Sequence, residues 1–231
     1  MTGEWVEWHR AYIEDPSMGD RLRLVQSRIC EALHRRPPGP IRVISACAGD
    51  GRDLLGALAE HPRGRDVRAR LVELSPELAA AGRDRAAREG LRDVEFIVGD
   101  ASSTSAYSGG VPADVLLFCG VFGNISDADV RATIRHLPEL CARDATVIWT
   151  RGRFEPDLTR AIRGWFAEEG FGELSFETVP NTTRSVGAHR LTAVPRPFRP
   201  EVKLFTFLPR EERPSTLARD HPGVRASTGT P

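Results

Sequence analysis

The residues best suited to chemistry surround a short glycine-rich turn. In "RVISACAGDGRDLL", residues 42–55, an apolar run stops at "AGDG" and a leucine-bearing helical pattern follows. Glycines such as Gly49 and Gly51 accept positive φ angles and let another molecule approach the backbone closely. A helix that begins at Arg52 would point its free amides and its positive dipole end at this turn. The pattern therefore predicts a ligand site where a buried strand gives way to a helix.

Two acidic residues narrow the choice of ligand. A dinucleotide fingerprint requires a third glycine where this sequence has Leu54. Glu73 stands near the end of the second predicted strand, and its carboxylate can accept hydrogen bonds from both hydroxyls of a ribose. Asp100 ends the third predicted strand and can accept a hydrogen bond from the exocyclic amine of adenine. These features favour a nucleoside that carries an amino acid over a dinucleotide.

The elements that must position these residues alternate along the chain. Strands and helices that follow one another at this spacing predict a parallel sheet covered on both faces. Two later strand-like runs, "GELSFETVP" and "SVGAHRLTAVP", have no helix between them and predict an antiparallel hairpin. The predicted strands are 41–47, 68–75, 94–100, 113–120 and 145–152, and the predicted helices are 52–61, 76–90, 126–141 and 156–170.

Together, the first strand, "CAGDG", the two acids and the closing hairpin resemble a class I S-adenosylmethionine-dependent methyltransferase over roughly residues 41–195. The resemblance implies that the glycine turn contacts the methionine part, that the acid after the second strand holds the ribose, and that the acid after the third reaches the adenine. It also implies that the backbone at the end of the fourth strand lies beside the sulfonium. The cofactor-binding residues implied are Cys47, Ala48, Gly49, Gly51, Glu73, Leu74, Asp100, Ala101, Cys119 and Gly120.

The sequence departs from the family pattern at two positions. Ser45 stands where the family usually has an acid in the first strand, and Cys47 replaces the first glycine. A side chain at Cys47 narrows the turn, so the ribose and adenine contacts are better supported than the methionine contacts. Asp50 could contact the ligand or could be a turn residue. Asp53 could likewise contact the ligand or could only complement the helix dipole.

The expected fold is α/β, a Rossmann-like, doubly wound, mostly parallel seven-stranded sheet with an antiparallel C-terminal hairpin strand. We expect an N-terminal helical cap or lid over residues 1–36, the methyltransferase domain over 37–212, and a polar, disordered tail over 213–231. The segment "EVKLFTFLP", residues 201–209, alternates apolar and polar positions. We expect it to cover the sheet edge or to pair with a second subunit.

Composition excludes several classes of protein. The 231 residues include 32 basic and 32 acidic residues, so the net charge gives no argument for nucleic acid or membrane surfaces. No apolar run approaches the roughly 20 residues of a membrane span, and "MTGEWVEWHR" has no apolar signal core. We expect a cytoplasmic protein that is monomeric or homodimeric. We expect no metal site, because the four cysteines are dispersed along the chain: Cys30, Cys47, Cys119 and Cys141.

Catalytic residues are harder to predict, because a sulfonium is already activated and transfer can proceed largely by positioning. Candidates on the acceptor side are His9 and Tyr12 in "WHRAYIEDP", which could instead form a core-facing stripe, and Asn124 in "CGVFGNIS". We expect an enclosed, mostly apolar cavity for the acceptor between the N-terminal segment and the loop 119–126, with Phe122 and the tryptophans as its apolar walls. His189 lies within a predicted strand, where a structural role is favoured.

We expect in-line methyl transfer to a small-molecule acceptor. The sequence has no N-P-P-Y after the fourth strand and no basic, aromatic-interleaved surface for RNA. Two alternatives remain open: a non-methylating enzyme on the same fold, such as an aminopropyl transferase or a cyclase, and a cofactor-binding assembly module without turnover.

Overall fold

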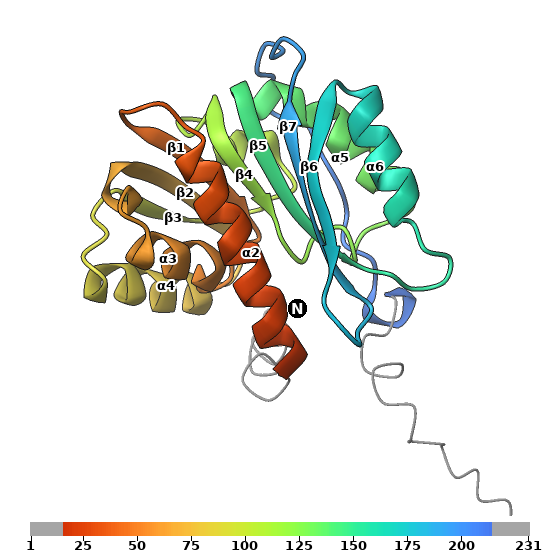
Figure 1. Ribbon diagram of the computed structural model, residues 1–231, viewed down its shortest axis with the longest axis horizontal. Helices are drawn as coiled ribbons and strands as arrows, with labels where there is room; N and C mark the ends of the chain where they lie inside the picture. The colour runs from red at the N-terminus through yellow and green to blue at the C-terminus, as the bar shows by residue number, and fades with distance from the viewer. Residues whose placement is uncertain (1–15, 214–231) are drawn as a thin grey trace, which may run out of the picture.

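A seven-stranded sheet forms the centre of the molecule (Figure 1). The computed structural model describes residues 16–213. The strand order is β3-β2-β1-β4-β5-β7-β6; β1 to β5 are parallel, and β7 is antiparallel to both β5 and β6. This confirms the predicted fold class. The strands are β1 Ile41–Ala46, β2 Val67–Glu73, β3 Val94–Val98, β4 Ala113–Phe118, β5 Cys141–Gly152, β6 Phe171–Thr178 and β7 Arg184–Leu191.

Helices cover both faces of the sheet. Successive side chains of a strand point to opposite faces. Val43 accordingly belongs to the core cluster that includes residues of α2, α3 and α4, and Ile44 to the cluster that includes residues of α5 and α6. In Figure 1, α2 passes in front of the sheet, and α3 and α4 lie near β1 to β3. The helices are α2 Pro16–His34, α3 Arg52–Glu60, α4 Pro76–Arg88, α5 Asp127–Leu140 and α6 Thr159–Glu168.

Local capping explains where two of the helices begin. The Ser75 side chain accepts a hydrogen bond from the backbone N–H of Leu78, and Pro76 occupies the first turn of α4. Ser126 accepts from the backbone N–H of Asp129 at the start of α5, as its sequence pattern predicts. Both caps follow strand ends, so they fix the loops that leave the carboxyl edge of the sheet.

Helix α2 is part of the near helical layer. It packs against α3 and against strands β4, β5 and β7. Its apolar stripe is buried at Val25, Ile29 and Leu33, and burial extends towards its start at Met18. The rest of the predicted cap, residues 1–15, lies outside the described residues, as does most of the predicted tail.

The C-terminal segment corrects one expectation from the sequence. Residues 196–208, which we call the strap, bond to Pro138 of α5 and to the loops after β3 and β4, and within the described residues they add no strand to either edge of the sheet. The connection from β3 to β4 provides only a short 3-10 helix, η2 Thr104–Tyr107, on this face. Leu204 and Phe205 of the strap are buried in the core there. The strap therefore completes a helical layer that the β3–β4 connection leaves thin.

Among the helices within residues 16–213, none has the length and apolar character needed to span a membrane.

Candidate functional site

The carboxyl ends of the central strands meet at one edge of the sheet. Ala46 pairs with Val72 and Glu73 with Val98, so β1, β2 and β3 end nearly level. The order of the strands reverses between β1 and β4. In open α/β sheets, ligands bind outside the carboxyl ends of the strands at such a switch point. The loops after β1, β2, β3 and β4 therefore form the candidate site.

The turn after β1 has a left-handed backbone at three residues. The φ angles are 52° at Cys47, 58° at Gly49 and 72° at Gly51. For Cys47, which has a side chain, this conformation costs about 1–2 kcal/mol. The position where the resembled family has glycine thus retains a glycine-like backbone.

Gly51 also has a packing reason to be glycine. A Cβ atom there would lie 2.9 Å from Phe96 Cζ and 3.0 Å from a methyl of Leu71. Real Cβ atoms rarely make such contacts, so a larger residue would push α3 away from the sheet. Gly51 therefore lets the helix sit close to the strands and keeps its amide end over the turn.

Glu73 connects the ends of β1 and β2. Its Oε2 accepts a hydrogen bond of 2.8 Å from the backbone N–H of Gly49, and its Oε1 accepts one of 2.8 Å from Ser75. The residue is only 6% exposed. Each carboxylate oxygen keeps a second lone pair, so the group can accept further hydrogen bonds while it holds the turn. Beside it, Leu74 is 52% exposed and presents an apolar surface at the same edge.

Asp100 lies after β3, next to this pair of strands. The backbone N–H of Gly99 donates to the carbonyl of Glu73 at 3.0 Å, which joins the two loops. Asp100 Oδ1 accepts a hydrogen bond from the Ser102 backbone N–H at 2.9 Å. Burial alone would raise the pKa of Asp100, but hydrogen bonds from Ser102 and Lys203 hold it below its ordinary value. The neighbouring Ala101 is buried, and its carbonyl accepts from the Tyr107 hydroxyl.

The loop after β4 is held by two side chains. The backbone N–H of Gly120 donates to Thr150 Oγ1 at 2.8 Å, and the same oxygen accepts from Arg21 at 3.1 Å. Asn124 Nδ2 donates to the Gly120 carbonyl at 2.7 Å. Asn124 thus fixes the loop that it belongs to. The sequence did not predict a role for Thr150 or Arg21, because both are far from Gly120 along the chain.

A buried carboxylate lies beside this loop. Oδ1 of Asp53 is buried and has no hydrogen-bond partner in the described part of the chain. Burial raises the pKa of Asp53, although Arg21 opposes the shift, and the carboxylate also contacts the Cys119 thiol. Burial and the nearby Asp53 raise the pKa of Cys119 well above its ordinary value, so this thiol is not an activated nucleophile. An unsatisfied carboxylate oxygen is suited to a cationic ligand group.

Asp50, in the turn itself, is engaged within the protein. Its carboxylate pairs with Arg52, with Nε 2.8 Å from Oδ1 and Nη2 2.9 Å from Oδ2. This two-point contact favours the interpretation of Asp50 as a turn residue.

Several other residues lie away from this edge. His189 is buried in the middle of β7, where its Nδ1 accepts from Trp149 Nε1 at 3.2 Å and its ring stacks on Phe166. Phe122 is fully buried against Phe118 and Trp149, so the expectation that Phe122 and Trp149 line a pocket is wrong: both complete the core beneath α5 and α6.

His9 and Tyr12 lie outside the described residues, as does one wall of the cavity expected between the N-terminal segment and loop 119–126. Within residues 16–213, no group of three or more histidine, cysteine, aspartate or glutamate side chains could hold a metal ion.

Comparisons with known proteins give matches at the level of structure alone. No family model matches this chain. No curated protein matches it in sequence. Magnesium protoporphyrin IX methyltransferase from Synechocystis PCC 6803, solved with bound S-adenosylmethionine, is similar with a TM-score of 0.64 and 14% identity over 82% of this chain and 91% of that one.

Two further solved structures agree. The CurJ carbon methyltransferase has a TM-score of 0.64 and 15% identity, and the match covers 83% of this chain and 59% of that chain. Precorrin-6y C5,15-methyltransferase from Geobacter metallireducens GS-15 has a TM-score of 0.53 and 14% identity over 73% and 87% of the two chains. The chain therefore has the fold of the class I S-adenosylmethionine-dependent methyltransferases.

Proposed function

We propose that this protein is an S-adenosylmethionine-dependent methyltransferase that acts on a small molecule. The observation that carries the proposal is Glu73, which holds the glycine turn through Gly49 and keeps free lone pairs at the switch point. Asp100 stands one strand further along the same edge. A turn, a ribose acceptor and an adenine acceptor thus follow one another across adjacent strand ends.

The residues present fit the parts of this cofactor. The free lone pairs of Glu73 suit ribose hydroxyls, and the exposed Leu74 offers an apolar surface for an adenine ring. Asp100 suits the adenine amine. At the other end, the unpartnered Oδ1 of Asp53 suits an ammonium group such as that of the methionine part. The cofactor, when bound, would supply an activated methyl group.

The protein's own part in the reaction is mainly positioning. Thr150 and Asn124 fix the loop after β4 from two sides, which keeps the Gly120 backbone in one place. Residues held in this way can align an acceptor with a methyl group without any proton transfer. His9 and Tyr12, with Asn124, are the proposed acceptor-side residues, and a general base among them is needed only where the acceptor carries a proton.

Two structural neighbours support a small acceptor, because they are named for magnesium protoporphyrin IX and precorrin-6y. No feature of residues 16–213 specifically favours the alternatives of an aminopropyl transferase, a cyclase or an assembly module.

A ligand panel tests the proposal. S-adenosylmethionine and S-adenosylhomocysteine should each raise the thermal midpoint, since a ligand at a hundredfold excess over its Kd stabilises a protein by about 2.7 kcal/mol. NADH should not. The Glu73→Ala variant should bind S-adenosylhomocysteine at least about tenfold more weakly, because hydrogen bonds to charged groups contribute about 1.5–3 kcal/mol.

The matched control is Glu95→Ala, which removes an exposed glutamate that pairs with Arg70 on the neighbouring strand. It should leave the affinity unchanged. Stabilisation by NADH alone would refute the proposed cofactor, and equal affinities of the two variants would remove Glu73 from the binding site.

A further inference from the structure

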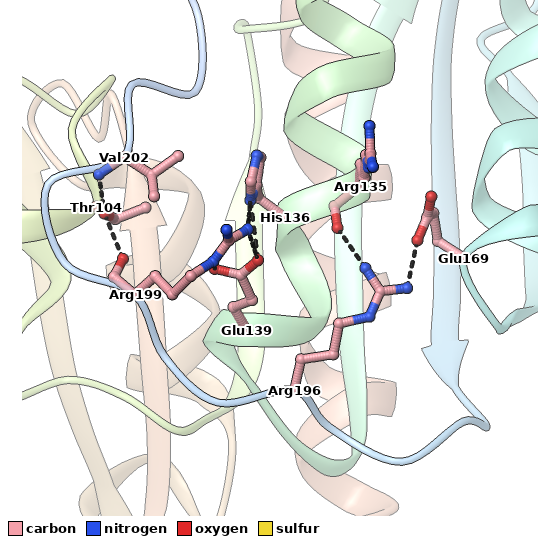
Figure 2. A network of polar contacts seen from close by, with 8 residues as sticks. All are labelled: Thr104, Arg135, His136, Glu139, Glu169, Arg196, Arg199 and Val202. Atoms are coloured by element: carbon pink, nitrogen blue, oxygen red, sulfur yellow. Dashed lines mark hydrogen bonds and ion pairs between the residues drawn. The ribbon is translucent and has the colours of Figure 1, made fainter.

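The strap is fixed to α5 at the end where it begins. Arg196 donates to the carbonyl of Arg135 at 3.0 Å and to the Glu169 carboxylate at 2.6 Å. Arg199 donates to both oxygens of the buried Glu139, at 3.1 and 2.6 Å. Figure 2 shows both arginines reaching across from the strap. Burial would raise the pKa of Glu139, but hydrogen bonds from Arg199 and His136 hold it below its ordinary value.

The strap is also fixed to the loop after β3, which belongs to the candidate site. Thr104 Oγ1 donates to the Arg199 carbonyl at 2.8 Å and accepts from the Val202 backbone N–H at 2.9 Å (Figure 2). The backbone N–H of Thr104 donates to the Val202 carbonyl at 3.0 Å, and that of Leu204 donates to the Ser102 carbonyl at 2.7 Å. Main-chain bonds thus hold both neighbours of Lys203.

Lys203 itself reaches the proposed adenine acceptor. Its Nζ lies 3.3 Å from Asp100 Oδ2, while Oδ1 of the same carboxylate accepts from the Ser102 backbone N–H. It is the single lysine of the sequence, among 32 basic residues. Both oxygens of Asp100 are therefore oriented by groups whose own backbone is fixed, and each oxygen has a lone pair left.

We propose that Lys203 is a positioning residue for cofactor binding, which orients the Asp100 carboxylate towards the amino group of the adenine ring. The inference rests on the proposed function, and it makes the strap part of the binding site. The competing interpretation is an exposed ion pair without consequence, since the side chains of Lys203 and Asp100 are 59% and 58% exposed and such pairs often contribute little.

Calorimetric titration of the full chain with S-adenosylhomocysteine at low ionic strength distinguishes the positioning role of Lys203 from an exposed ion pair without effect on binding. Lys203→Met should weaken binding about two- to fivefold, the range that corresponds to one favourably placed exposed ion pair. Lys203→Arg should restore the affinity. Without ligand, the thermal midpoint of Lys203→Met should fall by no more than that of Arg131→Met, which loses an ion pair of similar exposure.

Arg131→Met is the matched control. It breaks another exposed ion pair, Arg131–Glu168 at 3.2 Å with 63% and 57% side-chain exposure, between α5 and α6 and outside the proposed cofactor contacts. It should leave the affinity for S-adenosylhomocysteine unchanged.

The Asp100→Asn background shows whether Lys203 acts through Asp100. There, Lys203→Met should produce no further loss, because the charge that it orients is gone. An equal loss in both backgrounds, or a Lys203→Met affinity equal to that of Arg131→Met, would overturn the inference and leave the proposed function intact. If the wild-type protein itself fails to bind S-adenosylhomocysteine, the proposed function fails, and this inference fails with it.

Discussion

His189 illustrates how burial turns an ionisable residue into a structural one. Desolvation lowers its pKa to about 4, against the attraction of the nearby Glu173 and with a small further contribution from Arg163. Glu173 Oε2 lies 3.6 Å from its Nε2. The ring is therefore neutral at pH 7, and its Nδ1 serves as an acceptor for Trp149.

This burial predicts a pH dependence of stability. The folded state binds fewer protons than the unfolded state between pH 4 and 6.5, so the free energy of unfolding should fall as the pH drops through this window. At pH 4, the neutral burial of His189 should lower the free energy of unfolding by about 3 kcal/mol relative to pH 7. His189→Asn keeps an acceptor for Trp149 without titrating and should flatten the profile measured by chemical denaturation.

A slope identical to that of the wild type in the His189→Asn variant would show that the acid sensitivity arises elsewhere.

The sequence predicts Glu73 and Asp100 as site residues but does not predict the contacts that they make. An acid at a strand end can be recognised from the periodic pattern of the strand, because that pattern depends only on residues nearby in the sequence. The hydrogen bond from Gly49 to Glu73 joins residues on different strands, and Lys203 reaches Asp100 from far along the chain. No local pattern encodes such pairs.

Among the elements, the Thr104 side chain provides a buried polar link between the strap and η2. The side chain is fully buried, and its hydroxyl bonds to both Arg199 and Val202. Thr104→Val keeps the shape of the side chain but removes both bonds, which should cost about 1–3 kcal/mol. Hydrogen exchange should then speed up at the amides of Val202 and Leu204.

Thr182→Val is the matched control for this prediction. Thr182 Oγ1 likewise donates to a carbonyl, that of Val179, and accepts from the Arg184 backbone N–H, but in the turn between β6 and β7. Its loss should affect exchange in that turn and leave the strap protected. Faster exchange of the strap in both variants would indicate general destabilisation instead of a local link.

The elements themselves were largely predictable. Alternating strand and helix patterns, with the cap at Ser126 and the proline at Pro76, gave boundaries within a few residues of α4 and α5. The strap was not predictable, because an alternating segment such as "EVKLFTFLP" specifies that one side is buried but not by what. The sequence predicts no helix between the strands 94–100 and 113–120, but which segment packs over the face that this connection leaves thin is apparent only from the structure.

For the whole molecule, the described residues contain both a closed core and all of the proposed cofactor contacts. The buried residues of α2 begin at Met18, and Ser17 Oγ accepts a hydrogen bond of 2.9 Å from Arg184 on β7. The proposed cofactor contacts lie between Cys47 and Lys203. The proposed acceptor-side residues His9 and Tyr12, in contrast, precede residue 16.

This division predicts the result of a truncation. A variant that begins at residue 16 should fold and bind S-adenosylhomocysteine within about threefold of the full chain, because its core and its cofactor contacts are retained. This variant should lack methyl-transfer activity, which can be measured once a screen of small molecules has identified an acceptor.

A variant that begins at residue 19 lacks Ser17 and the buried Met18, and the loss of that core side chain should cost about 2–5 kcal/mol of stability. Full transfer activity in the variant that begins at residue 16 would exclude His9 and Tyr12 from the acceptor site, whereas loss of S-adenosylhomocysteine binding would place a cofactor contact within residues 1–15.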